Sequence, residues 1–227
     1  MKQVIIFSMM IFISLSVYAN DIYVNQSGAT LDLDITQDGQ NNTVGSASTA
    51  SSVIGATTNL AITQIGDSNV MTFDVNGATY TGTYSVTGDS NNIDFNCDSG
   101  GSNSSCGTAT ASIVWVGSSN DIDIDIGETS SATSATVGIT GASGSDSNTV
   151  LGTIDGNSAI LTLSINGDTN NFLVDIDGNG DSVGHTYIHT HTGSIADVDI
   201  TQSGIYDNMI TLTTSGDNHD IDITQTD

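Results

Sequence analysis

The chain has almost no basic residues. Its 227 residues include 26 Asp and Glu but a single Lys or Arg. That residue is Lys2, so the rest of the chain has no fixed positive side chain. Without cations to displace the counterions of a phosphate backbone, we expect no binding to nucleic acid. Anionic lipid surfaces are disfavoured for the same reason, which leaves metal cations and protons as the expected partners of the acidic surface.

The chain also has no Pro, few aromatic residues and almost no helical patterning. High charge with few aromatics can indicate disorder. Here, however, Ile, Val and Leu alternate with polar residues in short runs, and continuous β-ladders exclude Pro because it lacks an N–H group. Beyond the first nineteen residues no stretch has apolar residues at helical spacing. These features predict an all-β fold.

Residues 1–19 have the features of a secretion signal. Lys2 is followed by the apolar run VIIFSMMIFISLSV and then by VYA, which ends at Ala19 with small residues where a signal peptidase cleaves. The run is shorter than a membrane span, and no later segment is apolar enough to cross a membrane. We therefore expect a secreted chain, residues 20–227, with no membrane insertion after cleavage. A retained anchor is the alternative.

The two cysteines fit an exported, oxidised protein. Cys97 and Cys106 enclose DSGGSNSS, which contains no apolar residue. We expect a disulfide that closes a surface loop, with two free thiols as the alternative. The spacing does not suit a C-x-x-C redox pair, and no second pair of cysteines could complete a zinc site.

A Gly-x-x-Asn marker recurs along the chain, flanked by alternating apolar residues. The shortest steps, from Gly66 to Gly88 (22) and from Gly144 to Gly167 (23), indicate a repeat unit of about 22–23 residues. Longer steps indicate the same unit with small polar insertions, in the segments 43–58, 96–110, 127–136 and 177–193. The complete markers are Gly39/Asn42, Gly66/Asn69, Gly88/Asn91, Gly117/Asn120 and Gly167/Asn170, and the near-copies are Gly144/Asn148, Gly204/Asn208 and Gly216/Asn218.

Each unit contains two short strands. In runs such as LDLDI and DIDIDIG the apolar residues alternate with Asp, so one side of each strand is buried and the other is wet. A single unit cannot bury its apolar side, whereas coaxial stacking of units buries it. Residues 20–227 are thus predicted to form one β-solenoid domain with a thin core of Ile, Val and Leu. Gln and Asn at equivalent positions would form amide ladders along the stack.

The recurring Ile-Thr-Gln motif and the residues around it are similar to the repeats of a known family. Gln26 and Gln37 are eleven residues apart, and Gln-x-Gly opens at Gln26, Gln37, Gln64 and Gln202, followed at motif spacing by Asn42 and Asn69 and one place late by Asn208. This pattern resembles the curlin-repeat family, the subunits of bacterial curli amyloid fibres. The middle units depart from it, since Val86, Val116 and Ile165 stand about where Gln would be.

The resemblance implies a structural protein, secreted from a bacterium or held at its surface. Such a subunit would self-assemble into curli-like fibres for adhesion and biofilm matrix by stacking β-rungs, with other copies of itself as partners. The chain contains no nucleotide-binding or hydrolase motif, so no enzyme activity is expected. The expected ladder and assembly residues are Gln26, Gln37, Asn42, Gln64, Asn69, Gln202, Asn208 and Gln225.

Stacking raises an electrostatic problem. Asp above Asp at about 4.8 Å costs on the order of 0.9 kcal/mol per pair in water. Staggering the residues, protonating them or binding cations would relieve it. Cation candidates are Asp121, Asp123 and Asp125 on one strand. A second candidate is the calcium-loop start formed by Asp175, Asp177 and Asn179 before Gly180, although Thr186 stands where the bidentate Glu belongs. Ca²⁺ binding at this loop and diffuse counterion binding both remain open.

Two further readings remain open. His185, His189 and His191 lie in the polar stretch HTYIHTH and are expected to be solvated residues of a loop. The alternative follows from their shared parity, since an extended strand would present them on one face to bind a metal or respond to pH. The rival function is a monomeric binding solenoid, either a calcium-dependent adhesin or an ice-binding protein with the Thr residues of TYTGT and TLTT in a flat array. The Asp-rich faces argue against ice binding.

Overall fold

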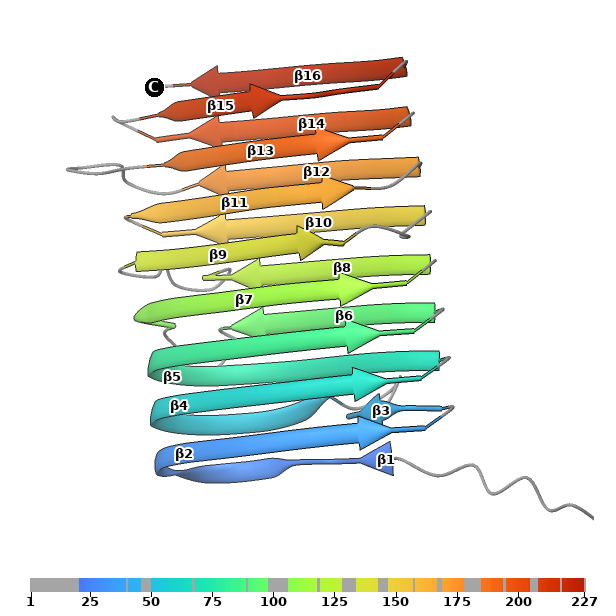
Figure 1. Ribbon diagram of the computed structural model, residues 1–227. Helices are drawn as coiled ribbons and strands as arrows, with labels where there is room; N and C mark the ends of the chain where they lie inside the picture. The colour runs from blue at the N-terminus through green and yellow to red at the C-terminus, as the bar shows by residue number, and fades with distance from the viewer. Residues whose placement is uncertain are drawn as a thin grey trace, which may run out of the picture.

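The computed structural model confirms the predicted fold, an all-β chain whose coils stack into a β-solenoid (Figure 1). The predicted signal segment 1–19 lies outside the described residues, among which no helix is long and apolar enough to cross a membrane. The described residues are 21–39, 41–45, 50–66, 68–88, 90–97, 106–117, 119–127, 134–142, 147–156, 158–166, 169–177, 185–193, 195–204, 208–216 and 218–226.

The strands form two faces that run along the solenoid. The first face contains β1 (Asp21–Ile22), β3 (Thr43–Val44), β6 (Ser90–Cys97), β8 (Ser119–Ile126), β10 (Ser147–Asp155), β12 (Thr169–Asp177), β14 (Ile195–Ser203) and β16 (Asn218–Thr226). The second face contains β7 (Thr108–Val116), β9 (Ser134–Gly141), β11 (Ala159–Asn166), β13 (Thr186–Thr192) and β15 (Met209–Thr213). Three long strands turn the corner and contribute to both faces: β2 (Asn25–Asp38), β4 (Ser51–Ile65) and β5 (Ser68–Thr87).

All strand pairs are parallel and in register, so equivalent residues stack into columns. Asp21 pairs with Thr43 at an offset of 22 residues (43 − 21), and β14 pairs with β16 at an offset of 23 (218 − 195). The longest offset is 29, between β6 and β8 (119 − 90) and between β5 and β7 (108 − 79), and both of these spans include the inserted Cys97–Cys106 segment. The 22–23-residue unit with insertions is thus the coil of the solenoid.

One of the markers was placed at the wrong corner. The Gly204/Asn208 marker implies a coil boundary, but the Gly193 amide bonds the carbonyl of Ser215, which puts the boundary at Gly193. Gly204 follows β14 and lies at the opposite corner. A Gly followed by Asn occurs at both corners of the coil, so the marker alone does not distinguish them.

Glycine closes the corner between the second and the first face. Gly66 has a φ of 146°, a conformation that L side chains rarely adopt. A Cβ at Gly66 would also collide with the carbonyl of Gly39 in the coil below. The Asn of the marker, in contrast, does not serve the turn: Asn69 is buried inside the solenoid at the start of a strand.

Two of the predicted insertions contain strands. The segment 43–58 includes β3 and the start of β4, and the segment 177–193 includes β13. The first segment looks polar because Ser and Thr fill half of its positions, and the second because Gly, Asp, Ser, Thr and His fill most of its positions. Yet Val53 and Tyr187 are fully buried, and the residues that share their parity point inward with them. Parity therefore outweighs mean polarity in deciding where these residues lie.

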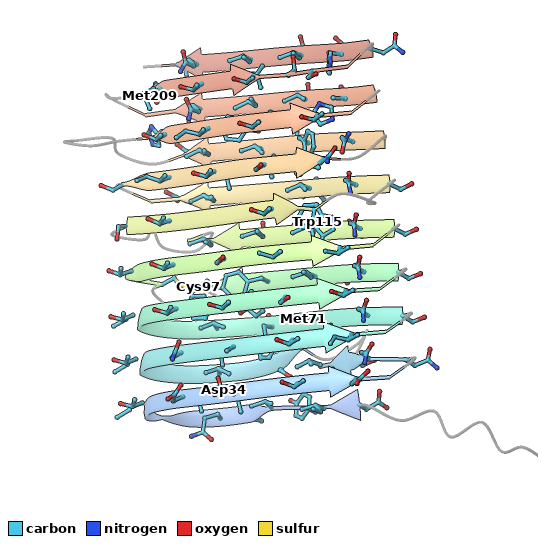
Figure 2. All side chains as sticks on the ribbon, viewed as in Figure 1. Asp34, Met71, Cys97, Trp115 and Met209 are labelled. Atoms are coloured by element: carbon cyan, nitrogen blue, oxygen red, sulfur yellow. A yellow bond between two sulfur atoms is a disulfide. The ribbon has the colours of Figure 1, made fainter. Side chains whose placement is uncertain are left out.

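The core contains more residue types than the predicted Ile, Val and Leu. Aromatic side chains lie within it, including the buried Trp115, and side chains stack in columns along the faces (Figure 2). Small residues make room for them. A Cβ at Gly141 would come within 2.6 Å of the Trp115 ring, and a Cβ at Gly82 would collide with Tyr80 and Tyr84.

Candidate functional site

A ladder of Asn side chains runs inside the first face. Asn69 Nδ2 donates to Asn42 Oδ1 at 2.7 Å, and Asn91 Nδ2 donates to Asn69 Oδ1 at 2.6 Å. The same contact continues from Asn120 to Asn91 and from Asn148 to Asn120. An amide can donate to one neighbour and accept from the other, so the column satisfies polar groups that would otherwise be costly to bury.

The Gln residues expected in ladders form two columns rather than one. On the second face Gln64 Nε2 donates to Gln37 Oε1 at 2.7 Å and to the Val70 carbonyl at 3.1 Å. On the first face Gln225 Nε2 donates to Gln202 Oε1 at 3.1 Å. Gln26 lies opposite Val53, at the far end of the same first-face column. Gln thus occupies both ends of this column, with apolar residues between.

The His residues of HTYIHTH are buried, so the prediction of a solvated loop is wrong. His185, His189 and His191 are at most 1% exposed, and they point inward from the second face as their parity predicts. His185 Nδ1 bonds Asn208 Oδ1 at 2.7 Å, so the predicted ladder residue Asn208 lies opposite His185 and not in the Asn column.

The His residues form a polar cluster with Tyr187 and two residues of the first face. His189 Nδ1 bonds Tyr187 Oη at 2.7 Å, and His191 Nε2 bonds the amide of Asn170 at 2.6 Å. The ring centroids of His191 and His219 are 5.5 Å apart. Burial, reinforced by the neighbouring His191 and His219, lowers the pKa of His189 to about 4. The neutral imidazole is therefore the favoured form of His189.

A second buried polar pair, Tyr80 and Tyr84, was not predicted. Their hydroxyl groups hydrogen-bond each other above Gly82. Burial raises the pKa of both hydroxyls far above the ordinary value. The signal in the sequence is the shared parity of Tyr80, Gly82 and Tyr84 in TYTGTYS, which places two polar-tipped rings and a space between them on the inward side.

The acidic residues are segregated to the first face. Apart from Asp32, Asp34 and Asp38 of β2, every Asp in a described strand belongs to that face. The outward positions of the second face from β4 to β15 carry no charged residue within the described ranges. They are rich in Thr, with Thr57, Thr63, Thr79, Thr81, Thr83, Thr110, Thr136, Thr140, Thr162, Thr190, Thr211 and Thr213 among them.

Staggering relieves part of the repulsion on the first face. Asp121 lies between Asn92 and Thr149, and Asn92 Nδ2 donates to Asp121 Oδ2 at 3.1 Å. Asp125 likewise lies between Asn96 and Thr153. Direct stacking remains in four pairs: Asp94/Asp123, Asp155/Asp177, Asp197/Asp220 and Asp199/Asp222.

Burial is the main cause of a raised pKa at Asp94, with contributions from Asp74 and Asp121. Burial and Asp177 likewise raise the pKa of Asp175. Burial also raises the pKa of Asp74, so a proton or a cation would favour all three of these carboxyl groups.

The predicted calcium loop is only partly within the described residues. Asp175 and Asp177 lie on the outward side of β12, and Ser203 Oγ donates to Asp177 Oδ1 at 2.6 Å. Asn179 lies outside the described residues. No group of three His, Cys, Asp or Glu residues suited to a metal ion occurs in the described part of the chain. Ca²⁺ binding stays a prediction.

The expected disulfide joins Cys97 at the end of β6 to Cys106, with Cα atoms 5.6 Å apart. Both residues are fully buried, and Cys97 shares its column with Val75 and Ile126. The bridge therefore joins the two ends of the inserted segment within the core.

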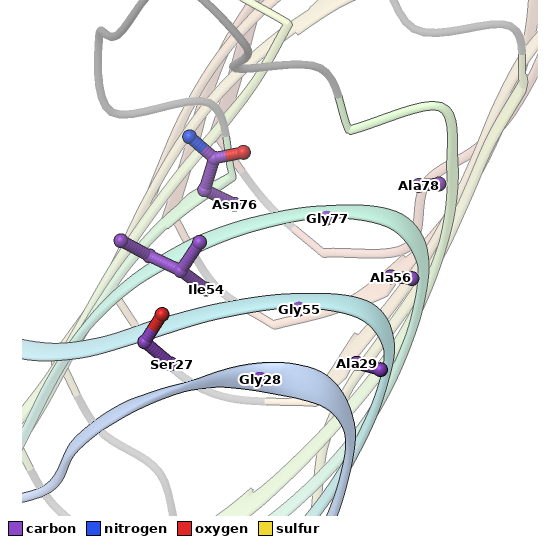
Figure 3. A pocket seen from close by; sticks show the side chains of 9 residues that line it. All are labelled: Ser27, Gly28, Ala29, Ile54, Gly55, Ala56, Asn76, Gly77 and Ala78. Atoms are coloured by element: carbon purple, nitrogen blue, oxygen red, sulfur yellow. The ribbon is translucent and has the colours of Figure 1, made fainter.

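A shallow groove follows the corner of the first coils (Figure 3). It is lined by uncharged and mostly small residues, Ser27, Gly28, Ala29, Ile54, Gly55, Ala56, Asn76, Gly77 and Ala78. The groove exists because Gly stacks on Gly there: a Cβ at Gly55 would approach the Gly28 carbonyl oxygen to 2.9 Å. Tight corner packing accounts for it fully.

The two ends of the solenoid are open β-edges. Among the described strands, β16 pairs with β14 alone and β15 with β13 alone, and at the other end β1 pairs with β3 and β2 with β4. Inward positions that are buried in the middle are partly exposed here. Ile223 is 44% exposed, whereas Ile200 below it in the same column is 1% exposed. The end strands thus have the same inward side-chain pattern as the interior strands, but no further coil of the described chain covers these side chains.

Comparison with protein-family models, with curated proteins and with solved structures finds no match to this chain.

Proposed function

We propose that the chain is a secreted structural subunit that polymerises end to end into curli-like extracellular fibres, which serve adhesion and biofilm matrix. The observation that carries this proposal is the pair of open edges, at which the apolar and Gln columns of the interior continue half-exposed. An open, regular edge is a template for another chain. A second copy of the chain has strands of matching length and side-chain pattern.

Apolar burial drives the addition of a copy. Ile210, Leu212 and Ile221 at one end, and Ile22 and Leu33 at the other, are only partly buried in the single chain. Covering a half-exposed Ile or Leu contributes about 1 kcal/mol. Gln225 would gain an amide partner, since the Gln pairs within the chain already have ladder geometry. Repulsion between acidic ends opposes the addition, so it is expected to be faster in salt.

The test is seeded growth of residues 20–227 at neutral pH, with and without millimolar Ca²⁺. We expect filaments of one width in electron micrographs, a diffraction spacing of about 4.7–4.8 Å and growth that accelerates on seeds. Monodisperse monomers at all concentrations, even with seeds, would rule out the fibre. A requirement for Ca²⁺ would show that the acidic columns need metal.

A matched pair of variants shows whether the ends are responsible. Ile223 and Ile65 are both 44% exposed, but Ile223 faces inward at an open edge and Ile65 faces outward on the second face. A Lys on an edge strand blocks edge pairing. We expect Ile223→Lys to abolish elongation and Ile65→Lys to leave it nearly unchanged. Equal loss in both variants would show that growth does not use this end.

The uncharged second face favours a second candidate, a monomeric solenoid that binds a solid surface such as ice. The objection to ice binding was the density of Asp, but from β4 to β15 the described outward positions of the Thr-rich second face carry no Asp. The test is ice recrystallisation inhibition by dilute monomer. Thr81→Lys on the second face should abolish inhibition if this function holds, and Thr149→Lys on the first face should not.

A further inference from the structure

The last two strands of the chain repeat the sequence of the first two. Residues 208–226 read NMITLTTSGDNHDIDITQT, and residues 20–38 read NDIYVNQSGATLDLDITQD. They align without a gap at an offset of 188 (226 − 38), and nine of the nineteen aligned positions are identical. The identical pairs are Asn208/Asn20, Ile210/Ile22, Ser215/Ser27, Gly216/Gly28, Asp220/Asp32, Asp222/Asp34, Ile223/Ile35, Thr224/Thr36 and Gln225/Gln37.

The match crosses from one face to the other. β15 belongs to the second face, but it matches β1 and the start of β2, which belong to the first. β16 belongs to the first face, but it matches the part of β2 that lies on the second. The two faces are interchangeable because each half-coil has the same length. Gln26 and Gln37 are eleven residues apart, and inward positions are five apart across both corners, from Gln26 to Leu31 and from Gln37 to Asn42.

We propose that the C-terminal end of one copy is continued by the N-terminal end of a second copy turned by half a turn about the solenoid axis. β1 and the start of β2 of the second copy then stack on β15, and the rest of β2 stacks on β16. The inference rests on the proposed function and specifies its junction. The partner is a second copy of this chain, and no other segment is needed to fill the contact.

The inward columns continue across this junction. Ile221 and Ile223 of β16 meet Leu33 and Ile35 of the second copy, and Gln225 meets Gln37. Within the chain, the later Gln of a pair donates from Nε2 to Oε1 of the earlier one, in both Gln37/Gln64 and Gln202/Gln225. Gln37 of the added copy would donate to Gln225 in the same sense. On the other side Ile210 and Leu212 meet Ile22 and Val24.

The register without rotation fits less well. Keeping each face in line would pair Gln225 with Gln26 at an offset of 199 (225 − 26). β16 would then meet the first-face strand β1. Among the described strands no second-face strand follows β16, so β15 and the next copy's β2 would be separated by a missing strand. The half turn leaves no gap on either face.

Pairs of Cys substitutions distinguish the two registers. Asp34 and Asp222 face outward and are exposed, and they become neighbours across the half-turn junction. Adjacent strands are about 4.7–4.9 Å apart, which allows a disulfide. In a single chain Asp34 belongs to β2 and Asp222 to β16, and these strands lie at opposite ends of the solenoid (Figure 1). The matched control is Tyr23→Cys with Asp222→Cys, because Tyr23 meets Asp222 only without rotation.

We expect oxidised fibres of Asp34→Cys/Asp222→Cys to give a ladder of dimers, trimers and longer chains on a non-reducing gel, and the Tyr23 pair to give monomers. Thr36→Cys/Thr224→Cys is a second half-turn pair, for use if the first pair does not fold. Cross-linking of the Tyr23 pair, or of neither register in intact fibres, would overturn the half-turn junction and leave the fibre standing. No fibres from the unsubstituted chain would overturn both.

Discussion

Two regions of the solenoid have the same coil arrangement, but their buried polar side chains form different hydrogen bonds. From β3 to β10 the first-face column is Asn on Asn, joined by amide hydrogen bonds from Asn42 to Asn148. From β12 to β16 the same column reads Asn170, Ala196 and His219, and the polar groups shift to the His residues of β13. There Asn170 bonds His191 across the core.

The difference shows what a stacked polar column requires. Each member must donate on one side and accept on the other, as an amide does at any pH. A neutral imidazole also has one donor and one acceptor, so it can replace an amide. A protonated imidazole has two donors and no acceptor. The amide region should thus be insensitive to pH, and the His region should not.

Acid is expected to produce the largest difference between the two regions. The folded pKa of His189 is about 4, below the unfolded value of about 6.5. The stability from this group is fully present above pH 6.5 and is lost as the pH falls from 6.5 to 4, to a total of about 3 kcal/mol. Hydrogen exchange at pH 7 and pH 4.5, corrected for intrinsic rates, should show β13 opening about 100-fold more readily and β5 changing little.

The double variant Tyr187→Phe/His189→Leu is the control for this acid effect. It replaces both hydrogen-bonded partners with apolar groups, which is nearly neutral in favourable cases. We expect the acid sensitivity of β13 to fall to that of β5. If the variant opens in acid as readily as the original chain, another group causes the effect.

Breaking the amide ladder in its middle should have the next largest effect. Asn91→Ala removes one bond to Asn69 and one from Asn120, both buried. We expect a loss of about 2 kcal/mol in the free energy of unfolding, measured by denaturant titration. Asn92→Ala, on the outer side of the same strand, should cost less than about 0.5 kcal/mol. Similar losses in both variants would show that the ladder contributes no stability.

The two Gln pairs offer a smaller contrast between interior and end. Gln64 makes two hydrogen bonds and is fully buried, so Gln64→Ala should cost about 1.5 kcal/mol. Gln225 is exposed at the open edge, and Gln225→Ala should cost less than about 0.5 kcal/mol in the monomer. The same change should slow seeded elongation several-fold. An unchanged elongation rate would show that Gln225 is not part of the growing end.

The smallest expected effect concerns the acidic first face. Burial, Asp74 and Asp121 raise the pKa of Asp94, so its charged form is disfavoured in the folded chain. Asp94→Asn should stabilise the chain at pH 7 by at most about 0.5 kcal/mol, because solvent screens most of the repulsion. The gain should vanish below the pKa of the carboxyl group, where Asp94 is already neutral. Thermal melts at pH 7 and pH 3 measure it, and a gain that persists in acid would exclude repulsion as its cause.

The sequence was sufficient to predict the solenoid and its coil length. Strict alternation in runs such as DIDIDIG gave the strands, and Gly at the corner recurs because no Cβ fits above Gly39. The His cluster was misjudged because the polarity of HTYIHTH outweighed its parity. Aromatic packing was missed, since it depends on which residues stack: Trp115 is accommodated only because Gly141 lies above it.

The equivalence of the two ends could not be recognised before the faces were known. The Gln residues were predicted to form ladders without being assigned to columns, because their columns depend on which corner each insertion lengthens. Only the register shows that Gln37 lies on the second face and Gln225 on the first. Once the faces are known, the match between residues 20–38 and 208–226 can be related to the way in which the two ends would stack.

The most direct test of end-to-end assembly is a helical reconstruction of the filaments by electron cryomicroscopy. We predict one continuous solenoid along the filament axis, with β2 of each copy in register with β16 of the copy before it. Filaments in which solenoids pack side by side, with β2 and β16 exposed at free ends, would contradict the account.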